Sequence, residues 1–305
     1  MGNLPATALL WITLKSGFIP AEYLNPRFGL SGRGLLVLAQ MLNRSMIFYF
    51  KRFFMRALFI LPLLILPLFA EATVLTAPAA INTIGSQRML TQRIVKAYCQ
   101  QGRGVNPEVA KQQISSSINQ FSAQLTNLLE SATVPESIAA VKKQEAQWQT
   151  FRTLAQTPPK ADTAKQLDDI AEGMQYDAGE LAKRLETALG KPQGKLIRIA
   201  GRQRMLSQRL AKTACLQSWH ANPALKLQQS QAQKEFAAGL ITLRASSQNT
   251  PATLKQLDLA QMQWVFLENA LSGLDTEADN NIATTSERLL EVMDKLSNQY
   301  ERLGN

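Results

Sequence analysis

The chain has 305 residues, of which 46% are hydrophobic and only 7% aromatic, and its formal net charge is +10. This length allows one large core or two small domains, and the low aromatic content argues against an all-β fold. Half of the net charge lies in residues 1–72, and elsewhere Lys and Arg are interspersed with Asp and Glu. We therefore expect no nucleic-acid partner, whereas the mild positive excess is compatible with a small anionic ligand.

The N-terminal part of the sequence is typical of a protein that is exported from the cytoplasm. Residues 1–54 lack a steady hydrophobic period, and we interpret them as an over-extended start or an unstructured segment. Residues 55–72 run from Met-Arg through an apolar stretch to Ala-Glu-Ala, which is the pattern of a secretory signal peptide. We expect cleavage after Ala72 and a periplasmic protein. The alternative is one uncleaved N-terminal helix that anchors the chain in the inner membrane.

A repeat occupies the rest of the chain. GSQRMLTQRIVKAYC at 85–99 matches GRQRMLSQRLAKTAC at 201–215 in nine of fifteen positions, at an offset of 116 residues. The same offset relates two later landmarks of each copy, which are Pro135 and Trp148 in the first and Pro251 and Trp264 in the second. Because order and spacing both persist, the repeat indicates a duplicated domain.

Each copy is predicted to be a bundle of four helices. Long stretches without Pro or Gly alternate with short breaks, which is typical of helices. We expect helices over 80–101, 107–131, 135–156 and 163–189, and again over 195–218, 223–247, 251–272 and 277–303. The expected fold class is all-α, with two tandem up-down four-helix bundles at 80–190 and 191–305.

The opening helix of each copy has two faces. One face is an ordinary apolar stripe that includes Leu90 and Ile94. The opposite face has the same four residue types in both copies: Gly85, Arg88, Gln92 and Cys99, then Gly201, Arg204, Gln208 and Cys215. A Gly lets another backbone approach, and an Arg offers a planar fork of donors to an oxyanion. This face is either a ligand site or a solvated exterior.

These motifs resemble the PilJ-type sensor domain, which is found at the N-terminus of type IV pili chemotaxis transducers. That domain is related to the periplasmic sensors of NarX/NarQ-type nitrate-responsive kinases. The resemblance is carried by Ile81-Asn82, GSQRMLTQR at 85–93, IAGRQRMLSQR at 199–209 and SERLLEVMDKLSNQYE at 286–301. It covers residues 80–304 as two tandem copies.

In the nitrate sensors, this part of the first helix binds nitrate between two subunits, with one Arg from each. The resemblance therefore implies that Arg88 and Arg204 contact a small anion, nitrate or nitrite, with Gly85, Gly201, Gln92 and Gln208 beside them. The sequence departs from the kinase pattern at Ser86-Gln87 and at Arg202-Gln203. Arg202 adds a charge that could alter the pocket.

Two arrangements of the copies stay open. If the link at 190–194 reverses the chain, the second opening helix runs parallel to the first in an internal pseudo-dimer, and Arg88 and Arg204 could face one ligand. If the copies stack end to end, each Arg needs a partner in a homodimer. A disulfide between Cys99 and Cys215 is possible only in the parallel arrangement. We favour two separate buried thiols.

The sequence contains one His and no P-loop or nucleophile-elbow motif, so we expect no enzyme, no metal site and no cofactor. Asp168 and Glu287 are interpreted as solvated helix charges. No kinase or methyl-accepting region accompanies the two copies. We therefore expect an exported sensory protein that binds a small oxyanion and signals through a separate signalling or envelope protein. The alternative is a structural interaction module without a ligand, docked on a pilus, transducer or envelope complex.

Overall fold

The computed structural model describes residues 74–219, 222–273 and 277–303. The segments 1–54 and 55–72, where we expect an over-extended start and a signal peptide or anchor, lie outside these residues. No helix in the described ranges is both long enough and apolar enough to cross a membrane.

The all-α prediction is confirmed, and every described helix lies within a few residues of its expected range. In chain order the helices are α2 (Ala77–Arg103), α3 (Pro107–Ser131), α4 (Pro135–Ala155), α5 (Ala161–Leu189), α6 (Pro192–Trp219), α7 (Pro223–Arg244), α8 (Pro251–Leu271) and α9 (Ala278–Glu301).

Prolines and glycines set the helix boundaries. Helices α3, α4, α6, α7 and α8 all begin at a proline, whose fixed φ suits the first turn and whose missing N–H is not needed there. The break between α5 and α6 is the shortest. Gly190 ends α5 with a φ of 64°, and Pro192 starts α6 two residues later. The chain therefore reverses at this point.

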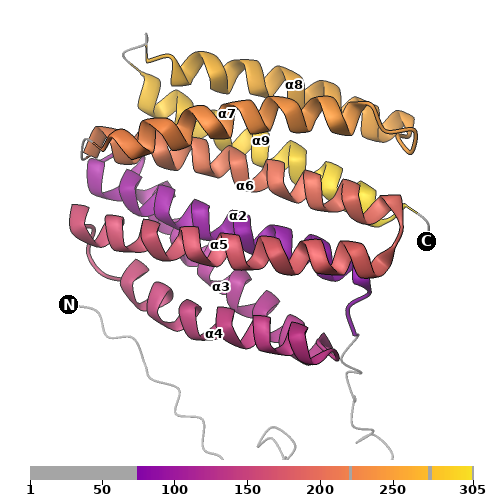
Figure 1. Cartoon of the computed structure of the whole chain (residues 1–305). Helices are drawn as coiled ribbons and strands as arrows, with labels where there is room; N and C mark the ends of the chain where they lie inside the picture. The colour runs from indigo at the N-terminus through magenta and orange to yellow at the C-terminus, as the bar shows by residue number, and fades with distance from the viewer. Residues whose placement is uncertain (1–73, 220–221, 274–276, 304–305) are drawn as a thin grey trace, which may run out of the picture. The chain divides into compact units, whose positions relative to one another are not determined.

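The reversal places the two opening helices side by side in the middle of one compact unit (Figure 1). Helices α2 and α6 contact each other more extensively than any other pair. Helices α3 and α5 pack on α2, and α4 packs on α5. Helices α7 and α9 pack on α6, and α8 packs on α9. Of the two arrangements that the sequence leaves open, the structure has the side-by-side one.

Two contacts fix the register of α2 against α6. The helices are parallel, because Gly85 lies against Gly201 near one end and Cys99 is bonded to Cys215 further along. A Cβ atom added to Gly85 would lie 3.1 Å from the Cα atom of Gly201, so any larger residue here would have to push the two backbones apart by a few tenths of an ångström. The expectation of two separate thiols is wrong: the parallel helices bring the two Cα atoms to 6.2 Å, within reach of a disulfide.

A methyl group at the glycine contact should loosen the central pair. We expect Gly85→Ala to lower the free energy of unfolding by roughly 1–3 kcal/mol, because the opposing atom is rigid backbone. Urea denaturation measures this change. Gly173→Ala is the matched control, since its added Cβ would meet only the Gln147 side chain at 3.9 Å. That control should gain up to about 1 kcal/mol. Equal losses in both variants would contradict the close-contact argument.

The disulfide closes a long loop, with 116 residues separating its two cysteines. Chain-entropy arguments give about 5 kcal/mol for a loop of this length, and measured values are often smaller. We expect Cys99→Ala with Cys215→Ala to lower the free energy of unfolding by roughly 2–5 kcal/mol in denaturant titrations. A reducing agent should produce a similar loss in the wild-type chain and none in the double variant. If the reducing agent leaves the free energy of unfolding of the wild-type chain unchanged, the disulfide does not contribute to stability.

Candidate functional site

The central helices are buried along most of their length, and several of their charged residues lie inside the protein. Arg88 is 5% exposed, Arg204 is 2% exposed, and Lys96 and Lys212 are fully buried. The reading of this helix face as a solvated exterior is therefore wrong. It arose because a single bundle leaves one face of each opening helix open, and in this fold the other half of the chain covers that face.

One cluster of buried charge joins α2 to α9. Arg93 Nη2 lies 2.5 Å from a carboxylate oxygen of Glu287, and Lys96 Nζ pairs with the other oxygen. Burial alone would raise the pKa of Glu287, but the two cations outweigh it and hold the pKa at about 2. The interpretation of Glu287 as a solvated charge is therefore wrong.

A matching cluster joins α6 to α5. Lys212 Nζ lies 2.7 Å from Glu172 and also pairs with Asp168, while Arg209 pairs with Glu172. Burial opposes the charge on Glu172, yet Lys212 and Arg209 hold its pKa below the ordinary value. Asp168 is only 8% exposed, so its interpretation as a solvated charge is wrong as well.

The cations of the two clusters correspond residue by residue. Arg209 and Lys212 follow Arg93 and Lys96 at the same 116-residue offset that separates the bonded cysteines. Their carboxylate partners, Glu172 on α5 and Glu287 on α9, are 115 residues apart and each pairs with one Arg and one Lys, whereas Asp168 has no acidic counterpart in the other cluster. Each glutamate binds the central helix of the opposite half, so the ion pairs cross between the halves.

Arg204 is neutralised by its own chain. Its Nη1 atom donates to Asp294 Oδ1 at 2.6 Å, and its Nη2 atom donates to the carbonyl oxygen and to Oδ1 of Asn82 at 2.9 and 2.6 Å. Burial lowers the pKa of Arg204, and the nearby Asp294 carboxylate opposes that change. Arg204 thus has a carboxylate partner within the chain, although its buried Nε atom has no hydrogen-bond partner in the described structure.

Arg88 has the same place in the repeat and a different environment. Its one hydrogen bond in the described structure runs from Nη2 to Gln175 Oε1 at 3.2 Å, and its buried Nε atom has no partner there. None of the ion pairs among the described residues includes Arg88. Burial, together with the positive charges of Arg202 and Arg198, lowers its pKa to about 10. The guanidinium is thus buried without a counter-ion.

The difference between the two arginines has a simple origin in the sequence. About two helical turns beyond Glu287 stands Asp294, and the same step beyond Glu172 reaches Gly179. A Cβ atom added to Gly179 would lie 3.3 Å from Arg88 Cζ. A glycine therefore stands beside Arg88 where a carboxylate stands beside Arg204.

The second partner differs too. Asn82 accepts two hydrogen bonds from Arg204, and the residue at the repeat offset from Asn82 is Arg198. Arg88 therefore faces a cation where Arg204 faces an acceptor.

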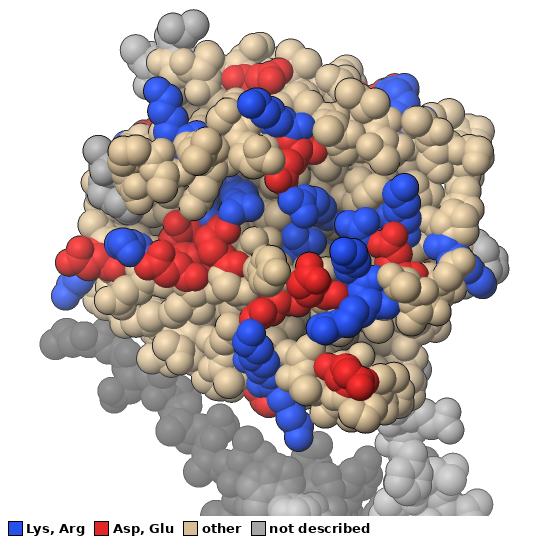
Figure 2. Space-filling view, in the orientation of Figure 1, with Lys and Arg blue, Asp and Glu red and all other residues tan. Residues whose placement is uncertain are grey.

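A polar cleft of about 470 Å³ opens over Arg88 between α2, α5 and α6. Figure 2 shows Lys, Arg, Asp and Glu side chains gathered across the middle of one face, over α5 and α6. Two of the cleft's arginines have carboxylate partners, since Arg198 pairs with Glu186 and Arg202 with Glu235. The lining residues are Arg88, Gln175, Tyr176, Gly179, Glu180, Lys183, Arg198 and Arg202.

Of the six expected ligand residues, only Arg88 lines this cleft. Gly85 and Gly201 form the helix contact. Gln92 Nε2 donates to Glu172 at 3.3 Å, and Gln208 Nε2 donates to the backbone carbonyl of Ser286 at 3.0 Å. Arg88 turns toward α5 and Arg204 toward α2 and α9, so the structure does not bring the two guanidiniums to one ligand.

Sequence reasoning did not select Gly179, Lys183 or Arg198 as site residues. For Arg198 a signal existed, because it breaks the repeat by replacing Asn82. The sequence indicates Arg202 only as an added charge near the pocket.

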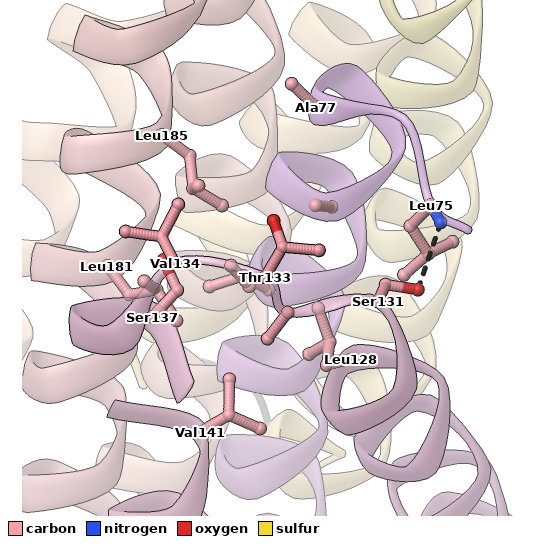
Figure 3. Close-up of a pocket in the computed structure, with 13 residues that line it drawn as sticks. Leu75, Ala77, Leu128, Ser131, Thr133, Val134, Ser137, Val141, Leu181 and Leu185 are labelled. Atoms are coloured by element: carbon pink, nitrogen blue, oxygen red, sulfur yellow. Dashed lines mark hydrogen bonds between the residues drawn. The ribbon is translucent and has the colours of Figure 1, made fainter. Parts of the chain in front are cut away.

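A second cavity is apolar and chemically unlike the first. It encloses about 190 Å³ between the start of α2, the α3–α4 link and the end of α5. Figure 3 shows Leu, Val, Ala, Ser and Thr side chains around it, and the Leu75 N–H donates to Ser131 Oγ at 3.0 Å. No charged residue lines it, so it does not suit an anion. Across the described ranges, no group of three or more His, Cys, Asp or Glu side chains could hold a metal ion.

Removing the Glu287 carboxylate should destabilise the folded protein. We expect Glu287→Gln to lower the free energy of unfolding by roughly 3–5 kcal/mol, because Lys96 loses its partner. Folding lowers the pKa of Glu287 from 4.5 to about 2, so its contribution is present above the unfolded pKa and disappears as the pH falls through the folded one. The wild-type chain should lose roughly 3 kcal/mol between about pH 5 and pH 2 from this group.

Denaturant unfolding at a series of pH values measures both effects. Glu291→Gln is the matched control, because it removes the same charge from an exposed position of the same helix. A similar loss of stability in both variants would show that the ion pairs of Glu287 are not responsible.

Comparison with known proteins gives one match. Residues 74–173 match the PilJ family model, described as "Type IV pili methyl-accepting chemotaxis transducer N-term". The match runs from the start of α2 into α5 and includes Arg88, whereas the second half of the chain is not part of it. No curated protein and no solved structure matches the chain. Residues 74–173 are therefore similar to the N-terminal region of these chemotaxis transducers.

Proposed function

We propose that the chain is an exported sensory protein that binds a small oxyanion at Arg88 and reports it to a separate signalling or envelope protein. The observation that carries this proposal is the buried Arg88 guanidinium, which lines an open cleft and lacks a carboxylate partner. A charge in such a position is costly unless an anion accompanies it. Nitrate and nitrite are the anions that the resemblance to nitrate sensors implies.

Two observations support the sensory and exported parts of the proposal. The matched family description is that of the N-terminal region of chemotaxis transducers, so a role in signal input agrees with it. The disulfide between Cys99 and Cys215 agrees with an oxidising compartment such as the periplasm.

The position of the cleft suggests how binding is coupled to a signal. An anion on Arg88 would lie between α2, α5 and α6, because Gly179 and Gln175 come from α5 and Arg202 from α6. The disulfide and the glycine contact hold α2 to α6, and the ion pairs of Glu172 and Glu186 hold α5 to α6. A ligand at Arg88 would add a further link among the three helices and so favour this arrangement over a looser one.

Calorimetric titration of the full-length chain with nitrate, nitrite and acetate in a chloride background tests the proposal. We expect saturable binding of at least one oxyanion and a loss of at least tenfold in affinity on Arg88→Met. Because the variant removes an uncompensated buried charge, its stability without ligand should equal or exceed that of the wild-type chain. This outcome separates a binding defect from a folding defect.

Arg244→Gln serves as the control, since Arg244 is an exposed residue paired with Asp258 on the far pair α7–α8. It should bind as the wild type does. If no oxyanion binds, or if binding persists in Arg88→Met, the proposal fails. Partner capture that is unaffected by anions would then favour the interaction-module alternative.

A further inference from the structure

The chain contains its own example of what a guanidinium at this position binds. Arg204 occupies the repeat position of Arg88, and its ligand is the side-chain carboxylate of Asp294, at 2.6 Å from Nη1. The Asp294 side chain is 47% exposed while that of Arg204 is 2% exposed. The carboxylate therefore approaches from the solvent side and caps a buried arginine.

At Arg88 the scaffold is the same and the carboxylate is missing. The equivalent of Asp294 is Gly179, whose Cα lies next to the guanidinium, because an added Cβ would be 3.3 to 3.6 Å from the Arg88 Cζ, Nη2 and Nε atoms. Because Gly179 has no side chain, the Arg88 guanidinium packs directly against the α5 backbone, and α5 supplies no carboxylate to it at this position. The same Arg88 face opens into the 470 Å³ cleft.

The cleft is larger than a lone inorganic oxyanion requires. Its volume lies in the range of sites that hold small organic molecules. Beyond Arg88 it offers Lys183, one helical turn after Gly179 on α5, and the phenol-bearing Tyr176. Arg198 and Arg202 are already paired with Glu186 and Glu235, so Arg88 and Lys183 are the cations of the lining that no described carboxylate holds in an ion pair.

From this internal precedent we infer that the ligand of the Arg88 cleft is a small organic carboxylate, whose carboxylate group takes at Arg88 the place that Asp294 takes at Arg204. The inference rests on the proposed function and names the chemical class of its ligand. The carboxylate accepts the hydrogen bonds of the guanidinium, its carbon skeleton lies in the cleft over Gly179, and Lys183 can meet a second acidic group. A planar fork of donors suits a carboxylate in two-point contact.

The first test compares ligands on the full-length oxidised chain. Acetate and succinate are titrated against nitrate in the same chloride background. We expect the better of the two carboxylates to bind at least tenfold more tightly than nitrate. Nitrate binding that equals or exceeds both would overturn the carboxylate assignment and leave the proposed oxyanion site intact. If none of these three anions binds and nitrite does not bind either, the proposed function fails and not only its refinement.

The second test adds a carboxylate side chain at position 179, beside Arg88. Gly179→Asp should place a carboxylate beside Arg88, raise the thermal midpoint and weaken the binding of added carboxylate at least tenfold. Gly179→Asn fills the same volume without the charge, so it should not raise the midpoint. An equal rise in both variants would show that volume and not the carboxylate is responsible, and would overturn the inference.

The third test leaves Arg204 without its carboxylate partner, so that it resembles Arg88. Asp294→Ala removes the carboxylate from Arg204, so the variant should have a lower thermal midpoint than the wild type. Added formate should raise the midpoint of this variant by more than it raises that of the wild type, and by more than nitrate does at equal ionic strength. Rescue by nitrate that equals rescue by formate would contradict the carboxylate preference.

Discussion

The structure depends on how closely α2 and α6 approach each other. At Gly85 and Gly201 no side chain separates the two backbones, and the disulfide repeats the constraint further along the same pair. Because the helices are parallel and in register, equivalent residues of the two halves meet across a local two-fold relation. Every polar residue on the facing sides must then find its partner inside the protein.

The crossed ion pairs show how that requirement is met. Each half sends a glutamate from its last helix to an Arg and a Lys on the central helix of the other half. The lysines are fully buried, so neither half can expose its central helix without also uncovering an unpaired charge. Such pairs contribute little net stability over apolar packing but specify one arrangement of the two halves, since any other leaves charges unpaired.

Much of the fold follows from the sequence, because helix boundaries depend on local residues such as Pro192 and Gly190. The repeat offset also predicts which residues are equivalent. The sequence could not show that Glu287 and Asp168 are buried, since both lie on helices that read as amphipathic and their partners are distant in the chain. It also could not distinguish Arg88 from Arg204, because both stand in the same Gln-Arg-Met-Leu segment of the repeat. The distinction resides in Gly179 and Asp294, on the last helix of each half and far from the arginines in the chain.

Because both halves belong to one chain, they stay paired however dilute the protein is. Two separate subunits would pair only above their dissociation constant, and a ligand between them would shift that equilibrium as well as occupy a site. Here the short link through Gly190 holds the halves at a high effective concentration, so their pairing does not depend on the protein concentration. A substitution also appears once per assembly, which allows one arginine to keep an internal carboxylate while the other stays open.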